Sequence, residues 1–589
     1  MLARDLCGFV FLLIAAAAHA AAPARQAAAA GQAAAAAAAA TPAGDPTAPL
    51  SAVTRQQGGV LPAEEMALSL EHLDLTMKID PATRSIAGDA TLTLKPSTSI
   101  GAVVLDLYAL YSIEAVYLDK VRLPAAAYRD ADGKLVITPR TRIAAGRSLA
   151  VRIVYAGVPH VAKRPPWDGG VVWSTAPDGE PWVGSSLWGG GCDMLWPCID
   201  HPRRKPALAD LHYIVPAPLV APANGVFLGM TERDGWRTWN WRARSPHTYG
   251  IFINVGPFKL LEADYHSRFG NRIPLKYWYL AGEEEKAAAL FKEFPLILDF
   301  FESQIGPYPW WDQKMGVVET SFSGMEHQTI NGYGSHYAKT MYGFDNLLEH
   351  EFAHEYFANP FLGNYDDMWL HEGFASYMQP LFGRYLHGDM DYYAMLMSQR
   401  AGILNEQPLV TGRERSEREV YADHSTGPTG DVYGKGSLVL HSLRELIGDA
   451  AFYESVRRLL YGRPDPKPGN FSGHFATSED FIEIVNRVTH QDLRWFFQVY
   501  LYRAALPQLI AERDGNLLKL LWRTPDDLPF PMPVEVRLGE HIVTVPMASG
   551  RGELELEPNA DLTLDPHSKL LRQSDAIDQF RAWKAVQPK

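Results

Sequence analysis

The feature that most constrains this chain is a pair of histidines four residues apart, His350 and His354, with Glu351 directly after the first. Residues four apart lie about 40° apart around an α-helix, so both imidazoles reach one point from one face. Glu351 projects to the side, where a carboxylate can take a proton from a metal-bound water. The pattern predicts a helix that presents a metal site to a cavity.

A second carboxylate follows at Glu372, within a Trp-Leu-His-Glu-Gly run that is also typical of a helix. Two histidines and one carboxylate leave an open coordination position, which a catalytic zinc requires. We therefore expect one Zn²⁺ per chain, held by His350, His354 and Glu372, with His371 outside the metal shell. The alternative is that these residues cap and pair two packed helices without a metal.

Length and composition indicate several packed domains. The chain has 589 residues, 47% of them hydrophobic and 21% charged, as in ordinary globular proteins. Its formal net charge of -13 argues against broad nucleic-acid binding, which needs a basic surface. We therefore expect no nucleic-acid partner.

Hydrophobic periodicity divides the chain into a multi-domain α+β protein. Alternating apolar and polar residues predict an N-terminal antiparallel β domain over residues 63–262. Helical spacing dominates a mainly helical catalytic domain over 263–507, where one helix is expected from Glu283 to Gln304. Alternation returns over 508–575, which predicts a small C-terminal β-sandwich, and residues 576–589 form a tail.

The N-terminus has the pattern of an export signal. Arg4 precedes an apolar run, and Ala18-His19-Ala20 matches a cleavage site, so residues 1–20 are expected to be a signal peptide. The run is short and rich in alanine, so no stable membrane anchor is predicted. An Ala-rich linker is expected over 21–62, and the protein is expected in the periplasm or outside the cell.

Two cysteines remain after such cleavage, Cys192 and Cys198. In an oxidising compartment they either pair across five intervening residues or stay as buried thiols, and the sequence leaves both readings open. Zinc ligation by them is not expected, because no second cysteine or histidine pair has the spacing of a zinc finger.

Further motifs surround the zinc pattern. Upstream lies Gly324-Met325-Glu326-His327-Gln328, and downstream lies Asp431-Val432-Tyr433-Gly434-Lys435-Gly436. In this order and spacing they resemble the aminopeptidase N family (peptidase family M1, of the gluzincin type), and the resemblance covers nearly everything after residue 65. It implies a thermolysin-like fold for the catalytic domain.

The resemblance also implies a function and residue roles. It implies a zinc-dependent aminopeptidase that hydrolyses the N-terminal bond of peptides. Glu351 would be the general base and Tyr433 would donate a hydrogen bond to the oxyanion. Gly324, Met325 and Glu326 would bind the substrate, with Glu326 gripping its free ammonium. The alternatives are a zinc endopeptidase or an epoxide hydrolase-like activity at the same site, and a catalytically idle peptide-binding protein.

The sequence departs from the family pattern in two places. The spacer between His354 and Glu372 holds 17 residues, one fewer than usual. Trp188 stands where the family usually has a second amine-binding Glu or Gln, so either Asp193 or a cation–π contact with Trp188 would replace it. A more open cleft is expected, because the long C-terminal helical domain of larger members has no counterpart here.

Overall fold

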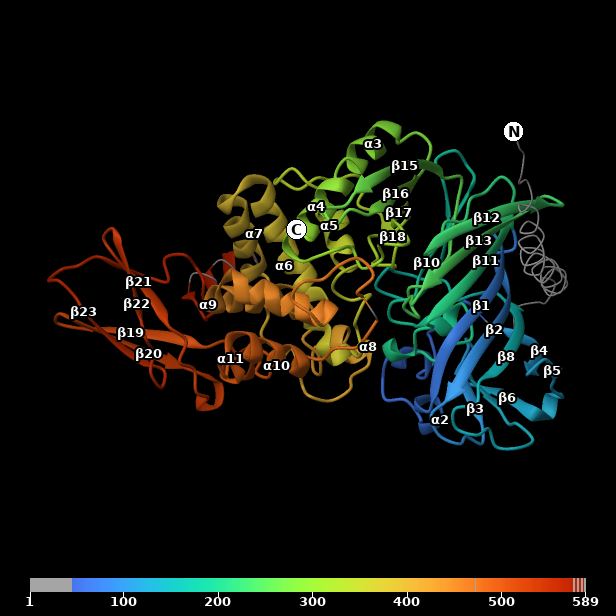
Figure 1. Ribbon diagram of the computed structural model, residues 1–589, viewed down its shortest axis with the longest axis horizontal. Helices are drawn as coiled ribbons and strands as arrows, with labels where there is room; N and C mark the ends of the chain where they lie inside the picture. Colours follow the sequence, from blue (N-terminus) through green and yellow to red (C-terminus); the bar gives the residue numbers. More distant parts are fainter. Residues whose placement is uncertain (1–44, 472, 576–577, 580–581, 584–585, 587–589) are drawn as a thin grey trace, which may run out of the picture.

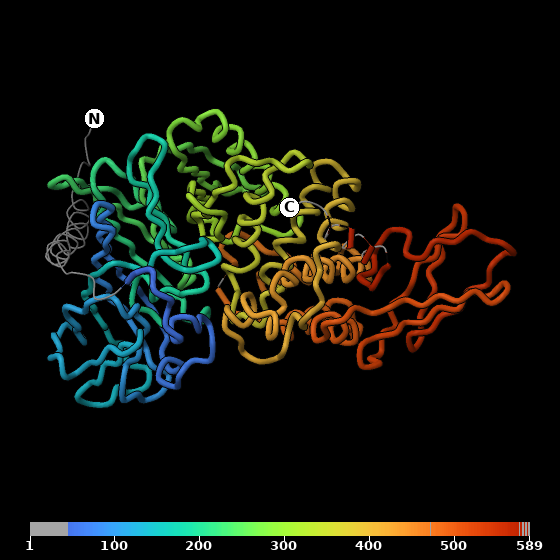
Figure 2. Tube along the Cα trace, turned by 180° about the vertical axis from the view of Figure 1, so that it is seen from behind, coloured from blue at the N-terminus to red at the C-terminus, as the bar shows by residue number. Residues whose placement is uncertain are grey.

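The computed structural model describes residues 45–575 except 472, together with residues 578–579, 582–583 and 586. Strands dominate the first part of the chain, helices the middle and strands again the end (Figure 1). The three parts follow one another along the longest axis of the molecule, and Figure 2 shows the same order from behind. The expected signal peptide lies outside the described residues.

The N-terminal part is built around an eight-stranded sheet in which β1 is central. β1 pairs antiparallel with β2 and parallel with β11, and all other neighbours are antiparallel. In sheet order the strands are β12 (Val226–Arg233), β13 (Trp236–Arg244), β11 (Leu208–Pro216), β1 (Leu68–Asp80), β2 (Ser85–Pro96), β8 (Leu149–Gly157), β4 (Ser112–Leu118) and β5 (Val121–Arg122). The expected β domain is therefore not purely antiparallel, because β1 and β11 run the same way.

Two smaller sheets complete this part. One contains β3 (Val103–Asp106), β7 (Lys134–Ile137) and β6 (Tyr128–Ala131), and the other contains β14 (Asn254–Val255), β10 (Pro181–Ser186) and β9 (Gly170–Thr175). The loop that follows β10 carries Trp188 and the two cysteines, which form a disulfide between Cys192 and Cys198. The structure thus selects the paired alternative for these cysteines.

The middle part begins with a four-stranded sheet of β15 (Lys259–His266), β16 (Arg272–Tyr279), β17 (Met315–Glu319) and β18 (Asn331–Tyr333). The loop between β17 and β18 carries the Gly-Met-Glu-His-Gln motif. Met325 and Gly332 exchange two backbone hydrogen bonds across this loop, which fixes its path beside the sheet.

Helices make up the rest of the middle part. They are α3 (Glu284–Phe291), α4 (Phe294–Gln304), α5 (Asn346–Ala353), α6 (Glu372–His387), α7 (Asp389–Ala401), α8 (Glu417–Tyr421), α9 (Asp431–Tyr461), α10 (Ser478–Thr489) and α11 (Arg494–Tyr500), and a short α2 (Ala63–Met66) precedes β1. The single helix expected from Glu283 to Gln304 is wrong. Pro295 lies in the first turn of α4, where its missing N–H costs nothing, so the chain ends α3 and starts again.

Helices α6 and α9 pack closely where Gly373 meets Gly436. A Cβ on Gly373 would lie 2.9 Å from the Gly436 Cα, and the reverse substitution meets the same contact. A side chain at either position would push the helices apart. The two glycines therefore set the distance between Glu372 on α6 and Tyr433 on α9.

The last part contains two three-stranded sheets. One is formed by β19 (Gln508–Asp514), β20 (Leu517–Arg523) and β23 (Arg551–Glu555), and the other by β22 (His541–Val545), β21 (Val534–Leu538) and β24 (Leu562–Leu564). Apolar side chains of both sheets, such as Leu520 and Val536, are buried.

The segment over residues 45–62 corrects the expected Ala-rich linker. Gln57 is buried, its side-chain amide donates to the Leu187 oxygen, and its side-chain oxygen accepts from the Gly189 amide. Its backbone oxygen accepts from the amide of Glu417 on α8. Folded structure therefore begins before the first strand. Among the described residues, no helix combines the length and apolar character needed to cross a bilayer.

Candidate metal centre

The described side chains of His350, His354 and Glu372 converge on one point. The two histidine Nε2 atoms are 3.2 Å apart, and they lie 3.4 and 3.3 Å from Oε2 of Glu372. His350 and His354 come from α5 and the residue that ends it, and Glu372 begins α6. Two elements separated in the chain thus supply one ligand set.

The donor set fits a zinc ion. Ligands at about 2.0–2.1 Å from a tetrahedral metal lie about 3.3–3.4 Å from one another, close to the distances seen here. Nδ1 of His354 donates to the Phe357 carbonyl at 3.2 Å, which leaves Nε2 free of a proton for a metal. Oε2 of Glu372 is buried without a hydrogen-bond partner among the described residues, so a cation satisfies it. The cofactor of this centre is zinc.

Glu351 lies beside the ligand set, in a cavity of about 180 Å³ that also contains the metal ligands. A Cβ on Gly324 would lie 2.3 Å from Oε1 of Glu351, so only glycine leaves room for this carboxylate. Burial, with the nearby Glu326 and Glu372 carboxylates, raises the pKa of Glu351 well above its ordinary value.

Glu326 lines the same cavity as Glu351 and Glu372. The Tyr249 hydroxyl donates to Oε1 of Glu326 at 2.7 Å, and burial raises the pKa of Glu326. The cavity thus concentrates three carboxylates, and no lysine or arginine is among the described residues that line it. Such a site favours cations of two kinds, a metal ion and a positively charged ligand group.

Two tyrosines also lie beside the ligand set. Tyr433, in the first turn of α9, lines the cavity, and its ring lies 6.0 Å from that of His350 at an angle of 28°. Tyr421, on α8, donates its hydroxyl to Oε1 of Glu372 at 3.1 Å. Burial raises the pKa of both hydroxyls, so each stays a proton donor at neutral pH.

Trp188 lies in the wall of the cavity, whereas Asp193 is not among the described residues that line it. The Trp188 ring packs edge-on with Tyr249 and Tyr421, at centroid distances of 5.4 and 5.2 Å. Asp193 is buried elsewhere, and its backbone oxygen accepts from the amide of Tyr108. Of the two expected replacements, only the tryptophan is therefore placed to meet a ligand.

Some neighbours were not found from the sequence. Tyr249, Tyr421 and Trp167 lie in loops or short elements where nothing in the local pattern marks them. His371 lies outside the metal set, as expected, but its buried ring is 4.2 Å from that of His354, and its nitrogens face Glu326 and Glu372 at 3.9 Å. In the sequence, only the position of His371 directly before Glu372 indicated that its ring lies near the metal set.

The fold and the ligand set define a mononuclear zinc centre of the H-E-x-x-H class, completed by a glutamate from a second helix. Residues 296–500 match the model of the peptidase family M1 domain. The matched part of the chain holds the whole metal set.

Curated aminopeptidases are similar to this chain. Leucine aminopeptidase 2 of Eremothecium gossypii is 24% identical over 436 residues, which cover 71% of this chain and 64% of the relative. Aminopeptidase Ey of Gallus gallus is 26% identical over 291 residues, covering 45% of this chain and 29% of the relative. The chain thus spans less than two thirds of these relatives.

Solved structures share the fold. An M1 zinc metallopeptidase from Deinococcus radiodurans is 25% identical, with a TM-score of 0.59, and covers 75% of this chain and 95% of its own. A mutant form of that enzyme bound to a Tyr-Ser-Ala substrate superposes with a TM-score of 0.61 at 24% identity, covering 75% of this chain and 95% of its own.

Proposed function

We propose that this protein is a zinc-dependent aminopeptidase that hydrolyses the N-terminal peptide bond of peptides. The observation that carries the proposal is the set of three buried carboxylates in one cavity, whose described lining residues include no lysine or arginine. Glu372 belongs to the metal set and Glu351 stands beside it as a base. Glu326 remains for a cation that the substrate brings, and the free ammonium of a peptide is that cation.

Each residue of the cavity has a defined task in this reaction. When bound, zinc supplies a Lewis acid that polarises the scissile carbonyl and lowers the pKa of water. Glu351 takes the proton of the attacking water and passes it to the leaving amine. Tyr433 donates its hydroxyl proton in a hydrogen bond to the oxyanion that develops on the carbonyl.

The substrate is held on the side opposite its leaving group. Glu326 binds the ammonium, while the backbone of Gly324 and Met325 runs along the same cavity wall and pairs with the first residue. Since the ammonium is anchored, only the first peptide bond reaches the metal. No specific observation on the described residues favours an endopeptidase or an epoxide hydrolase.

The rest of the peptide has a separate space. A second cavity, of about 600 Å³, has three lining residues in common with the first: Leu347, His350 and Tyr433. Amide and hydroxyl side chains such as Gln399 and Ser376 also line it. Glu326 does not line it. We infer that residues after the scissile bond occupy this space, so peptides of several residues are substrates.

The domain layout and the compartment belong to the same proposal. We propose a β domain over 63–262, a thermolysin-like catalytic domain over 263–507 and a β-sandwich over 508–575. We further propose export with cleavage after Ala20, which the disulfide between Cys192 and Cys198 supports. Sequencing the N-terminus of protein recovered from a periplasmic extract tests the cleavage.

The central test compares a fluorogenic alanyl or leucyl amide with its N-acetylated twin, with and without a zinc chelator. Chelator-sensitive cleavage of the free amine alone is expected. Equal cleavage of both amides, or cleavage of the blocked form alone, would overturn the aminopeptidase assignment.

A further inference from the structure

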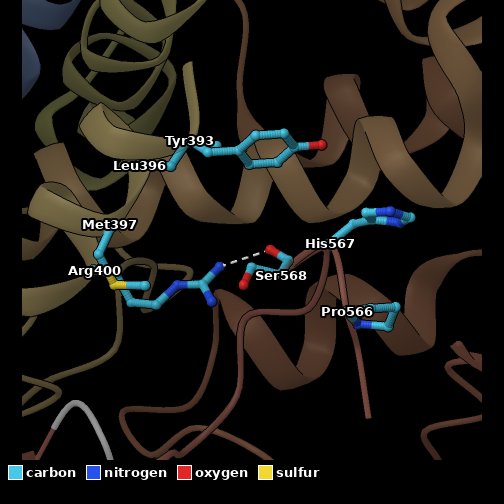
Figure 3. A pocket seen from close by; sticks show the side chains of 7 residues that line it. All are labelled: Tyr393, Leu396, Met397, Arg400, Pro566, His567 and Ser568. Atoms are coloured by element: carbon cyan, nitrogen blue, oxygen red, sulfur yellow. Dashed lines mark hydrogen bonds between the residues drawn. The ribbon is translucent and has the colours of Figure 1, made fainter. Parts of the chain in front are cut away.

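A third cavity lies between α7 and the segment that follows β24, and none of its described lining residues belongs to the metal set. Its volume is about 270 Å³, and Tyr393, Leu396 and Met397 form one wall. Pro566, His567 and Ser568 form the other (Figure 3). A cavity of this size accepts a small organic ligand rather than a peptide.

Arg400 supplies the charge of this cavity. Its side chain reaches from α7 toward Ser568, and Nη2 donates to the Ser568 carbonyl at 3.0 Å (Figure 3). The residue is only 8% exposed, and its Nε has no hydrogen-bond partner among the described residues. A buried guanidinium with unused donors is costly unless an acceptor is supplied.

Other buried arginines of this chain show what is missing here. Arg415 lies 2.5 Å from a carboxylate oxygen of Asp366, and Arg444 lies 2.9 Å from one of Asp449. Among the described residues, no carboxylate oxygen lies close enough to a side-chain nitrogen of Arg400, within 4.0 Å, to form an ion pair. Of these three buried arginines, Arg415 and Arg444 each lie beside a carboxylate, and Arg400 does not.

The neighbouring charges do not fill this gap. Asp565 is the nearby acid, but its two carboxylate oxygens accept from the backbone amides of Lys569 and Leu570. Arg572 adds a positive charge that opposes the effect of Asp565 on Arg400. His567 and Lys569 are already engaged by Glu535. The cavity therefore holds a buried guanidinium without a direct ion pair, beside apolar side chains.

We propose that this cavity is a binding site for a small monocarboxylate with a compact apolar body. The carboxylate accepts hydrogen bonds from Arg400, because a guanidinium offers donors in the planar geometry that a carboxylate matches. The apolar body packs against Tyr393 and Met397. Among the described residues that line the cavity, Arg400 is the only arginine or lysine, which matches a monoanion better than a phosphate.

The site adjoins the substrate space through α7. Gln399, the residue before Arg400, donates to the Ser376 carbonyl and accepts from the Ser437 hydroxyl, both at 2.7 Å, and it lines the large cavity next to the metal centre. The two cavities thus contact the same helical turn, although no described residue lines both.

The test uses 3-phenylpropionate and its neutral amide as probes in calorimetric titrations of the zinc-loaded protein. The carboxylate is expected to bind with a Kd of about 1 mM or tighter, and the amide to bind at least about tenfold more weakly. Arg400→Gln is expected to weaken carboxylate binding about tenfold or more.

A matched pair of variants at Met397 distinguishes binding at this site from binding at the zinc, which also attracts carboxylates. The pair also keeps the test valid if the Arg400 variant misfolds. Met397 is 55% exposed, so it tolerates substitution. Met397→Glu places a competing carboxylate beside Arg400 and is expected to abolish binding, whereas Met397→Gln, which removes the apolar contact without adding a charge, is expected to weaken it only severalfold. Equal binding by these two variants, or equal binding of acid and amide, would overturn the proposal.

Discussion

The hydroxyl of Tyr249 donates a hydrogen bond of 2.7 Å to Oε1 of Glu326. The donor comes from the loop after β13 and the acceptor from the loop after β17, so the N-terminal β part of the chain directly orients a carboxylate of the catalytic cavity. A hydrogen bond to a charged group contributes about 1.5–3 kcal/mol, enough to matter for substrate affinity.

Tyr249→Phe is expected to raise KM for a free-amine amide about tenfold or more, because Glu326 loses its orienting donor, with a smaller effect on kcat. Steady-state kinetics measure both constants. Tyr213→Phe is the control, since this buried hydroxyl donates to the Phe252 carbonyl and not to a carboxylate. Equal effects of the two substitutions would contradict the orienting role.

Glu351→Gln is expected to lower kcat by about 10²–10⁴, since an amide cannot take the proton of water. Zinc content, measured by atomic emission, is expected to stay the same, because the ligand set is untouched. The control is Glu454→Gln, which changes a half-buried pair with Arg458 outside the cavity. Loss of zinc from the Glu351 variant would assign it a structural role instead.

Gly324→Ala is expected to reduce kcat strongly while the fold is retained, because the new Cβ would lie 2.3 Å from Oε1 of Glu351 and must displace it. Activity and circular dichroism measured together check this. Gly101→Ala is the control, since a Cβ there comes near only the guanidinium of Arg142, at 3.1 Å, and no residue of the cavity. A fully active alanine variant would show that the Glu351 position is not critical.

Trp188→Ala is expected to lower kcat/KM about 10- to 100-fold, because the ring braces both Tyr249 and Tyr421 and each aromatic pair contributes about 0.5–1.5 kcal/mol. Trp188→Phe is expected to restore most of the loss. Kinetics on one free-amine amide measure this, with Trp239→Ala as the control outside the cavity. Full activity of the alanine variant would show that Trp188 only fills space and does not support the two tyrosines.

Asp210 gives a prediction for stability. Its carboxylate accepts two hydrogen bonds from Arg242, at 2.6 and 3.0 Å, and lies 3.0 Å from Nε2 of His72. Burial opposes ionisation, but these partners outweigh it and hold the pKa of Asp210 well below its ordinary value. Asp210→Asn is expected to lower the free energy of unfolding by about 1–3 kcal/mol at neutral pH.

The sign of the pH dependence follows from the lowered pKa. The contribution of Asp210 is complete above the unfolded-state pKa of about 3.9 and is lost as pH falls through the lower folded value. Urea unfolding at several pH values should therefore show a constant difference between wild type and variant down to about pH 5, and a shrinking one below about pH 4. Asp264→Asn, in an exposed pair with Arg272, should change little.

The sequence predicted the metal set well because its signal is local. His350 and His354 lie one helical turn apart, and Glu372 begins the next helix, so spacing alone carries the geometry. Tyr249 and Trp188 could not be predicted in the same way, since long-range folding brings their loops to the cavity. The resemblance named position 188 but not the packing of its side chain.

One further expectation failed for an identifiable physical reason. The helix expected from Glu283 to Gln304 ignored the break that Pro295 imposes. Asp366 and Asp367 follow the metal motif in sequence, but Asp366 accepts from the backbone and hydroxyl of Thr411, and Asp367 accepts from Ser478. Proximity in sequence is therefore a poor guide to which groups support a metal ligand.

The hydrogen bonds of Gln57 have a practical consequence for the smallest active form of this protein. This residue joins Leu187 and Gly189, next to Trp188, to the amide of Glu417. A shortened chain that starts at β1 keeps every zinc ligand and the whole M1 domain but loses the clamp behind the tryptophan wall. We therefore expect a fully active shortened protein to begin upstream of Gln57, within the segment that composition alone predicts to be a linker.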